Sequence, residues 1–122
     1  MASYASNSLL NIAANAATAS TITVRLHTGA PGNSGTTNQV SGASVSVAAN
    51  GWTAASGGVS ETTADTSFGV LSATASTTVT HYSLWQGSAF LGWADLTSSV
   101  TVAANEAFSL VGGTVEVQFS RS

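Results

Sequence analysis

The sequence of 122 residues has no cysteine and no lysine, and its charged side chains are two arginines and five acidic residues. Without cysteine, disulfides, thiolate metal sites and cysteine nucleophiles are excluded. Soluble domains are usually about one-quarter charged, whereas this chain is 6% charged. Enzymes usually gather several titratable side chains in one pocket. Such sparse charge therefore favours a protein held in a larger assembly over a free enzyme.

Positive charge and long apolar runs are also scarce. Arg25 and Arg121 lie far apart in sequence, and the formal net charge is −3. Nucleic-acid binding needs clustered basic residues, so we expect no direct contact with nucleic acid. No apolar run approaches the roughly 20 residues of a membrane span, and the N-terminus lacks the basic and apolar regions of a signal peptide. We therefore expect no membrane insertion.

What the sequence does contain is enough apolar residues for one core. The hydrophobic fraction is 43%, and a chain of this length fits one domain that buries roughly two-thirds of its surface. Intrinsic disorder requires low hydrophobicity together with high net charge. The composition therefore predicts a single folded domain.

Residues 1–20 are predicted to form a helical anchor segment. A helix is expected from Ser6 to Ala17, with Ser6 as N-cap and Ser3 as the alternative cap. Such a helix is too short to be stable alone, so it must dock on its own domain or on a neighbouring subunit. The apolar stripe recurs with helical spacing at Leu9, Ile12, Ala13 and Ala16.

From residue 21 onward the apolar residues alternate with polar ones, which is typical of half-buried strands. The segment 28–38 contains the only proline and three glycines, which predicts a loop. We predict an all-β fold for residues 21–122, an antiparallel β-sandwich or jelly-roll-like domain of about eight strands after a short N-terminal α-helix. The expected strands lie near 22–27, 45–47, 68–71, 77–86, 90–94, 100–102, 108–110 and 115–119.

The two histidines are the first candidates for chemistry. His27 and His81 each fall in a predicted strand. A metal site would require them to meet in space with Asp65, Asp95 or Glu106 as a third ligand. No short-range ligand spacing supports such a site, so we expect structural histidines, no metal and no cofactor.

No catalytic residues are predicted either. A Ser-His-Asp arrangement lacks the G-x-S-x-G turn that would support it. Asp95 is the candidate carboxylate of a hydrolase, but a turn residue closing the preceding strand is the favoured interpretation. Gly29, Gly32 and Gly35 lack the lysine of a phosphate-binding loop, so they indicate a turn.

The aromatic residues are the remaining candidates. Exposed rings can stack on sugars, whereas buried rings stabilise a core. Because long aliphatic side chains are few, core packing is favoured for Trp85 and Phe90. Trp52 and Trp93 stay open and could lie at a subunit interface. The candidate interface residues are Leu9, Leu10, Ile12, Trp52 and Trp93.

Several motifs occur together in a familiar order. They are SLLNI (8–12), ITVRLHTGAPGNSGT (22–36), VSG (40–42), VTHYSLWQG (79–87), FLGWADL (90–96) and VTVAANE (100–106). This order resembles a family of small tailed-bacteriophage virion proteins, labelled tail-fibre or minor tail proteins. Family members often carry an aromatic-Ala-Arg stretch after the VSG turn, whereas this chain has SVSVAANGW (44–52).

The resemblance implies a non-enzymatic virion structural protein, either a capsid decoration or head-fibre protein or a minor tail component. It would stabilise or ornament the particle through contacts with major capsid or tail proteins, after assembly in the bacterial cytoplasm. We expect a homo-oligomer, specifically a trimer. The alternative is a carbohydrate-binding module for attachment to a host glycan, and a depolymerising hydrolase is a remote third hypothesis.

Overall fold

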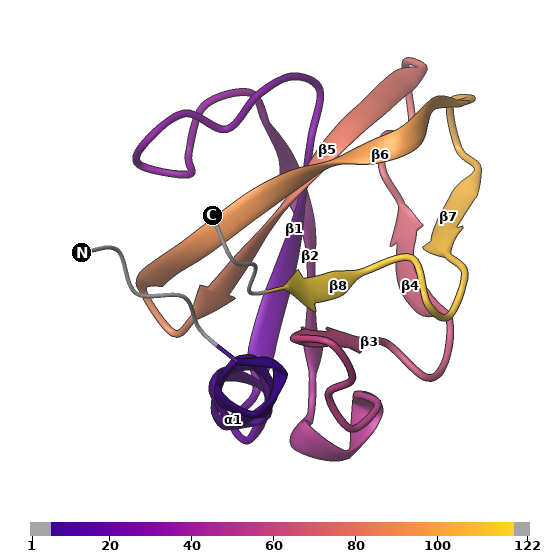
Figure 1. The fold of residues 1–122 in the computed structure, drawn as a ribbon. Coiled ribbons are helices and arrows are strands. Elements are labelled where there is room, and N and C mark those ends of the chain that lie inside the picture. The colour runs from indigo at the N-terminus through magenta and orange to yellow at the C-terminus, as the bar shows by residue number, and fades with distance from the viewer. Residues whose placement is uncertain (1–5, 119–122) are drawn as a thin grey trace.

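The computed structural model describes residues 6–118, and within them it contains one α-helix, a short 3-10 helix and eight strands (Figure 1). All paired strands are antiparallel, so the predicted all-β fold with an N-terminal helix is confirmed. Ser3 and Phe119 lie outside the described residues. The elements are α1 (Asn7–Thr18), β1 (Ile22–His27), β2 (Gln39–Val47), η1 (Ala49–Gly51), β3 (Val59–Glu61), β4 (Thr66–Val70), β5 (Thr77–Gln86), β6 (Ala89–Val102), β7 (Ala107–Leu110) and β8 (Glu116–Gln118).

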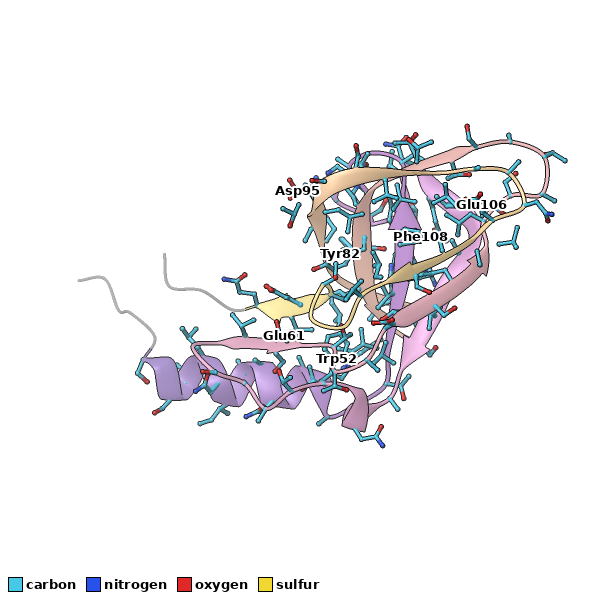
Figure 2. The ribbon with its side chains drawn as sticks, turned by 90° about the vertical axis from the view of Figure 1, so that its right-hand side faces the viewer. Trp52, Glu61, Tyr82, Asp95, Glu106 and Phe108 are labelled. Carbon is cyan, nitrogen blue, oxygen red and sulfur yellow. The ribbon has the colours of Figure 1, made fainter. Side chains whose placement is uncertain are left out.

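The strands form a sandwich-like arrangement. One four-stranded sheet has the order β2-β1-β5-β6, and the pairs β3-β8 and β4-β7 lie against it (Figure 1). One apolar cluster joins these layers and draws side chains from both. In Figure 2, Tyr82 and Phe108 lie between the layers, whereas Asp95 and Glu106 lie toward the outside.

The alternation of β1 decides which side of the sheet becomes the core. Ile22, Val24 and Leu26 are completely buried, while Thr23 and Arg25 take the opposite face and stay partly exposed. Complete burial of one such aliphatic side chain stabilises the fold by about 1.5–3 kcal/mol. The four-stranded sheet therefore has a core face and an outer face, and the outer face carries the polar residues of the site below.

Helix α1 begins at the expected cap, because the Ser6 hydroxyl accepts a hydrogen bond from the Leu9 backbone N–H at 3.2 Å. The predicted apolar stripe is not the docking face. Leu10 and Ala14 are buried, whereas Leu9 and Ile12 point away from the domain.

Two asparagines explain the orientation of the helix. The side-chain oxygen of Asn11 accepts a hydrogen bond from the Gly58 N–H at 2.7 Å, and that of Asn15 accepts one from the Ala55 N–H at 2.9 Å. These two residues are one turn apart and lie on one side of the helix. They fix α1 against the segment before β3 and leave the Leu9 side facing out.

The prediction of a turn at Asp95 is wrong. Asp95 lies within β6, directly opposite His81 of β5. The register between these strands shifts after that pair, so that Val100 lies opposite Val79. Extra residues bulge out of β6 and allow one strand to continue where the sequence suggested two. Strand β3 was also not predicted, because its only apolar residue is Val59 and the segment shows no alternation.

Candidate functional site

The outer face of the four-stranded sheet contains a chain of hydrogen bonds that runs from Thr37 to Trp85. His27 is fully buried, and its Nδ1 lies 2.9 Å from the carbonyl oxygen of Thr37. Its Nε2 lies 2.7 Å from the hydroxyl of Ser83, which also accepts a hydrogen bond from Trp85 Nε1–H at 2.8 Å. Because a carbonyl can only accept, Nδ1 carries the proton and Nε2 accepts the Ser83 O–H. Every polar atom in this chain of contacts has a partner.

This network links the loop 28–38 to the sheet. A side chain on Gly35 would overlap the ring of Phe90, and Gly35 has a φ of 75°, which glycine tolerates best. The Arg25 guanidinium lies 4.2 Å from the ring centre of Trp85, within the range of a cation–π contact. The loop is thus held on the sheet by close packing and by the His27–Thr37 hydrogen bond.

The Ser83 hydroxyl contacts a nitrogen of His27, as a serine nucleophile contacts its general base in many enzymes. The surroundings of this pair, however, differ from those of an active site. Ser83 is fully buried, and the group that orients His27 is a backbone carbonyl rather than a carboxylate. A substrate cannot reach the Ser83 hydroxyl in this conformation. The arrangement therefore fixes the loop 28–38.

The histidines and one acid do meet along a row of the sheet. His27 lies opposite His81 across β1–β5, and His81 lies opposite Asp95 across β5–β6. Both nitrogens of His27 are already used by Thr37 and Ser83. Among residues 6–118, no three His, Asp or Glu side chains gather closely enough to hold a metal ion.

Burial makes the fold sensitive to acid at His27. Removal from water lowers the pKa of His27 below the 6.5 of a free histidine. Below about pH 6.5 the unfolded chain binds a proton at this histidine, whereas the folded chain does not. The free energy of unfolding should therefore fall as the pH drops below about 6.5. Urea unfolding between pH 7.5 and 5.5 measures this slope. We expect His27→Gln to remove most of it; an unchanged slope in His27→Gln would contradict the assignment.

The predicted interface residues divide into two groups. Leu9, Ile12 and Trp93 have exposed fractions of 55%, 65% and 46%. Leu10 and Trp52 are buried, at 8% and 7%. In this conformation the side chains of the second group pack inside the chain itself and present almost no surface to a partner.

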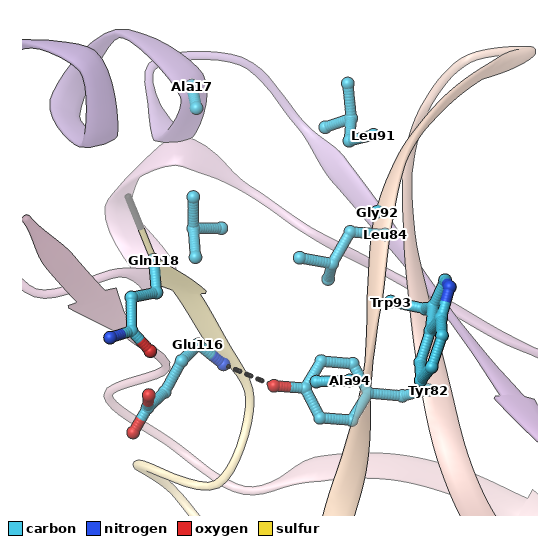
Figure 3. Close-up of a pocket in the computed structure, with 10 residues that line it drawn as sticks. Ala17, Tyr82, Leu84, Leu91, Gly92, Trp93, Ala94, Glu116 and Gln118 are labelled. Atoms are coloured by element: carbon cyan, nitrogen blue, oxygen red, sulfur yellow. Dashed lines mark hydrogen bonds between the residues drawn. The ribbon is translucent and has the colours of Figure 1, made fainter. Parts of the chain in front are cut away.

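A cavity of about 520 Å³ lies between the end of α1, the β5–β6 hairpin and β8 (Figure 3). The hydroxyl of Tyr82 accepts a hydrogen bond from the Glu116 backbone N–H at 3.1 Å, and burial raises the pKa of this phenol. The cavity has a size typical of ligand pockets, but sequence analysis did not indicate it. Its lining is mostly apolar and comprises Ala17, Tyr82, Leu84, Leu91, Gly92, Trp93, Ala94, Glu116, Val117 and Gln118.

Almost the whole sequence matches one known protein family. The model of the family described as podophage GP4 fiber I protein gp80 matches residues 1–118. The chain belongs to this family. The predicted resemblance to tailed-phage virion proteins is therefore confirmed, and membership in the fiber I family makes the chain a structural component of a phage particle.

A search of curated proteins finds no match to the sequence. Within the described residues, no helix is long and apolar enough to cross a membrane.

Proposed function

We propose that the chain is a non-enzymatic fibre subunit that assembles with further copies of itself, as a trimer, and with capsid or tail proteins of the virion. Membership in the phage fiber I family carries this proposal. The scarcity of charge agrees with it, because free proteins stay dispersed largely through surface charge. A subunit packed among neighbours needs much less charge.

The outward side of α1 is the proposed contact surface. Leu9 and Ile12 lie one helical turn apart, and both are exposed. The helix has no acidic residue in its first turn and no basic residue in its last. Two such helices can therefore approach without charge repulsion, and burial of their aliphatic side chains stabilises the contact.

The double variant Leu9→Ser/Ile12→Ser tests this surface. We expect its unfolding free energy to change by less than about 1 kcal/mol, because both side chains are exposed in the isolated chain. Its self-association, measured by light scattering, and its incorporation into particles should both be lost. Val111→Ser is the matched control, because Val111 is 68% exposed on another part of the surface. Normal assembly of the double variant would contradict the proposed surface.

The virion role itself is tested by electron microscopy of particles that lack the protein. We expect fibre density to be missing at defined positions on the particle. Particles with unchanged density and unchanged stability would refute the role.

Attachment to a host glycan is the second candidate function. The exposure of Trp93 favours it, because an aromatic ring open to solvent can stack on a sugar. Binding of the purified chain to host polysaccharide, compared with that of Trp93→Ala, distinguishes this function from a purely structural one.

A further inference from the structure

Trp93 differs from every other aromatic side chain in residues 6–118, because it alone falls in the exposed class, with 46% of its surface open to solvent. Trp52, Trp85, Tyr82 and Phe108 are buried. The position of Trp93 on β6 adds to its accessibility, since β6 is an edge strand of the four-stranded sheet. A ligand can therefore approach the indole both from the outer face and from the side of the sheet.

The Trp93 ring is held in place before any ligand arrives. The ring of His81 packs against it edge-on, with the ring centres 5.3 Å apart and the planes at 63°. His81 is fixed in turn by the contact of its Nδ1 with the Thr80 hydroxyl at 2.7 Å. A ring that is already ordered loses little conformational entropy on binding.

A carboxylate lies on the same face of β6 as the ring. Asp95 follows Trp93 by two residues, so the strand period places both on the outer face. Asp95 is exposed and lies opposite His81 in the β5–β6 register. A carboxylate accepts several hydrogen bonds from neighbouring hydroxyl groups. The surface thus combines the apolar face of the Trp93 indole with a strong hydrogen-bond acceptor, the Asp95 carboxylate, near its edge.

The charge around the ring restricts the ligand. Arg25 is the one arginine or lysine among the described residues, and its guanidinium stacks on Trp85. The carboxylate of Asp95 therefore gives the edge of the Trp93 ring a negative charge, and this charge repels an anionic ligand. A neutral molecule with an apolar C–H face and several hydroxyl groups fits both the ring and the carboxylate.

We propose that Trp93, His81 and Asp95 form a binding site for a neutral hexopyranose unit. The C–H face of the sugar stacks on the indole, and its hydroxyl groups donate hydrogen bonds to Asp95. His81 holds the indole in position and borders the sugar. This inference rests on the second proposed function and specifies the site and the class of sugar.

The site is tested by titrating the purified chain with glucose, galactose and N-acetylglucosamine, and with glucuronate as the anionic comparison. Nuclear magnetic resonance of the indole N–H groups reports on each tryptophan separately. We expect a shift of the Trp93 signal with at least one neutral sugar and weaker binding of glucuronate. Trp93→Ala should lower the association constant by roughly tenfold or more, and Trp93→Tyr should retain most of it.

Two variants separate this site from other surfaces. Asp95→Asn should weaken binding of the neutral sugar severalfold and reduce the difference between that sugar and glucuronate. Leu91→Ala should leave binding unchanged; Leu91 is 45% exposed on the same strand and lines the cavity of Figure 3. Because Trp93 also borders that cavity, loss of binding in Leu91→Ala would assign the sugar to the cavity and overturn the proposal, whatever the effect of Trp93→Ala. Absence of any Trp93 shift with all three neutral sugars would also overturn it.

Different experimental results would refute the virion role and the sugar site. Particles that contain the protein, together with a purified chain that binds none of the sugars, would refute the site alone. A chain that binds sugar through Trp93 but is absent from particles would refute the virion role alone.

Discussion

Replacing Trp52 with alanine should lower the free energy of unfolding by about 3–5 kcal/mol, the usual cost of removing a large aromatic side chain from a core. Trp52 is 7% exposed and belongs to the apolar cluster that joins the two layers. Its removal leaves a cavity between β-strands that cannot close completely. Urea unfolding at neutral pH, followed by circular dichroism, measures the change.

Trp93→Ala is the matched control for Trp52→Ala, because it removes the same side chain from an exposed position on β6. We expect a smaller change of about 1–2 kcal/mol, because the exposed ring still packs against His81. Equal effects of the two substitutions would show that the division into a core tryptophan and a surface tryptophan is wrong.

The second large effect is expected for Ser83→Ala, which should destabilise the fold by about 2–4 kcal/mol. The substitution leaves two buried groups without partners, Trp85 Nε1–H and His27 Nε2. Each buried polar group that loses its partner costs about 1–3 kcal/mol. Hydrogen exchange should also show earlier opening of the loop 28–38, because His27 would be held less firmly against Thr37.

Ser46→Ala is the control for Ser83→Ala. Ser46 also lies on the outer face, but its hydroxyl makes an exposed contact with Thr23 at 3.3 Å. We expect a change within about 0.5 kcal/mol. A double-mutant cycle between Ser83→Ala and His27→Ala then gives the coupling between the two side chains. A coupling near zero would contradict the network as described.

Local periodicity was sufficient to predict most of the fold. The alternation of Ile22, Val24 and Leu26 identified both β1 and its core face, because the strand period assigns each side chain to one side. Ser6 was identified as the helix cap from its residue type and position. These features depend on neighbours in the sequence, which a pattern records directly.

The errors concern contacts between distant residues. The orientation of α1 depends on hydrogen bonds from Asn11 to Gly58 and from Asn15 to Ala55, which span 47 and 40 residues. The local pattern indicated one stripe, at Leu9, Ile12, Ala13 and Ala16, and contains no information about these distant partners. Asp95 was assigned to a turn because a bulge in β6 interrupts the alternation without ending the strand.

The same limitation applies to the candidate site. Trp52 and Trp93 are equivalent as residue types, and only the tertiary fold places one inside and the other outside. The sequence contains many serines, and nothing in the local pattern distinguishes Ser83 from the others. Its role depends on a hydrogen bond to His27, which lies 56 positions away. Residue type and position favoured core packing for Trp85 and Phe90, but they could not separate Trp52 from Trp93.

The His27–Ser83 hydrogen bond joins two of the motifs that identify this chain, ITVRLHTGAPGNSGT (22–36) and VTHYSLWQG (79–87). These motifs are separate in the sequence, but in space they are the two halves of one junction. An evolutionary change in either half therefore alters the requirements on the other. Relatives too divergent for ordinary sequence comparison would be recognised more reliably by requiring a compatible pair at these two positions than by scoring each motif separately.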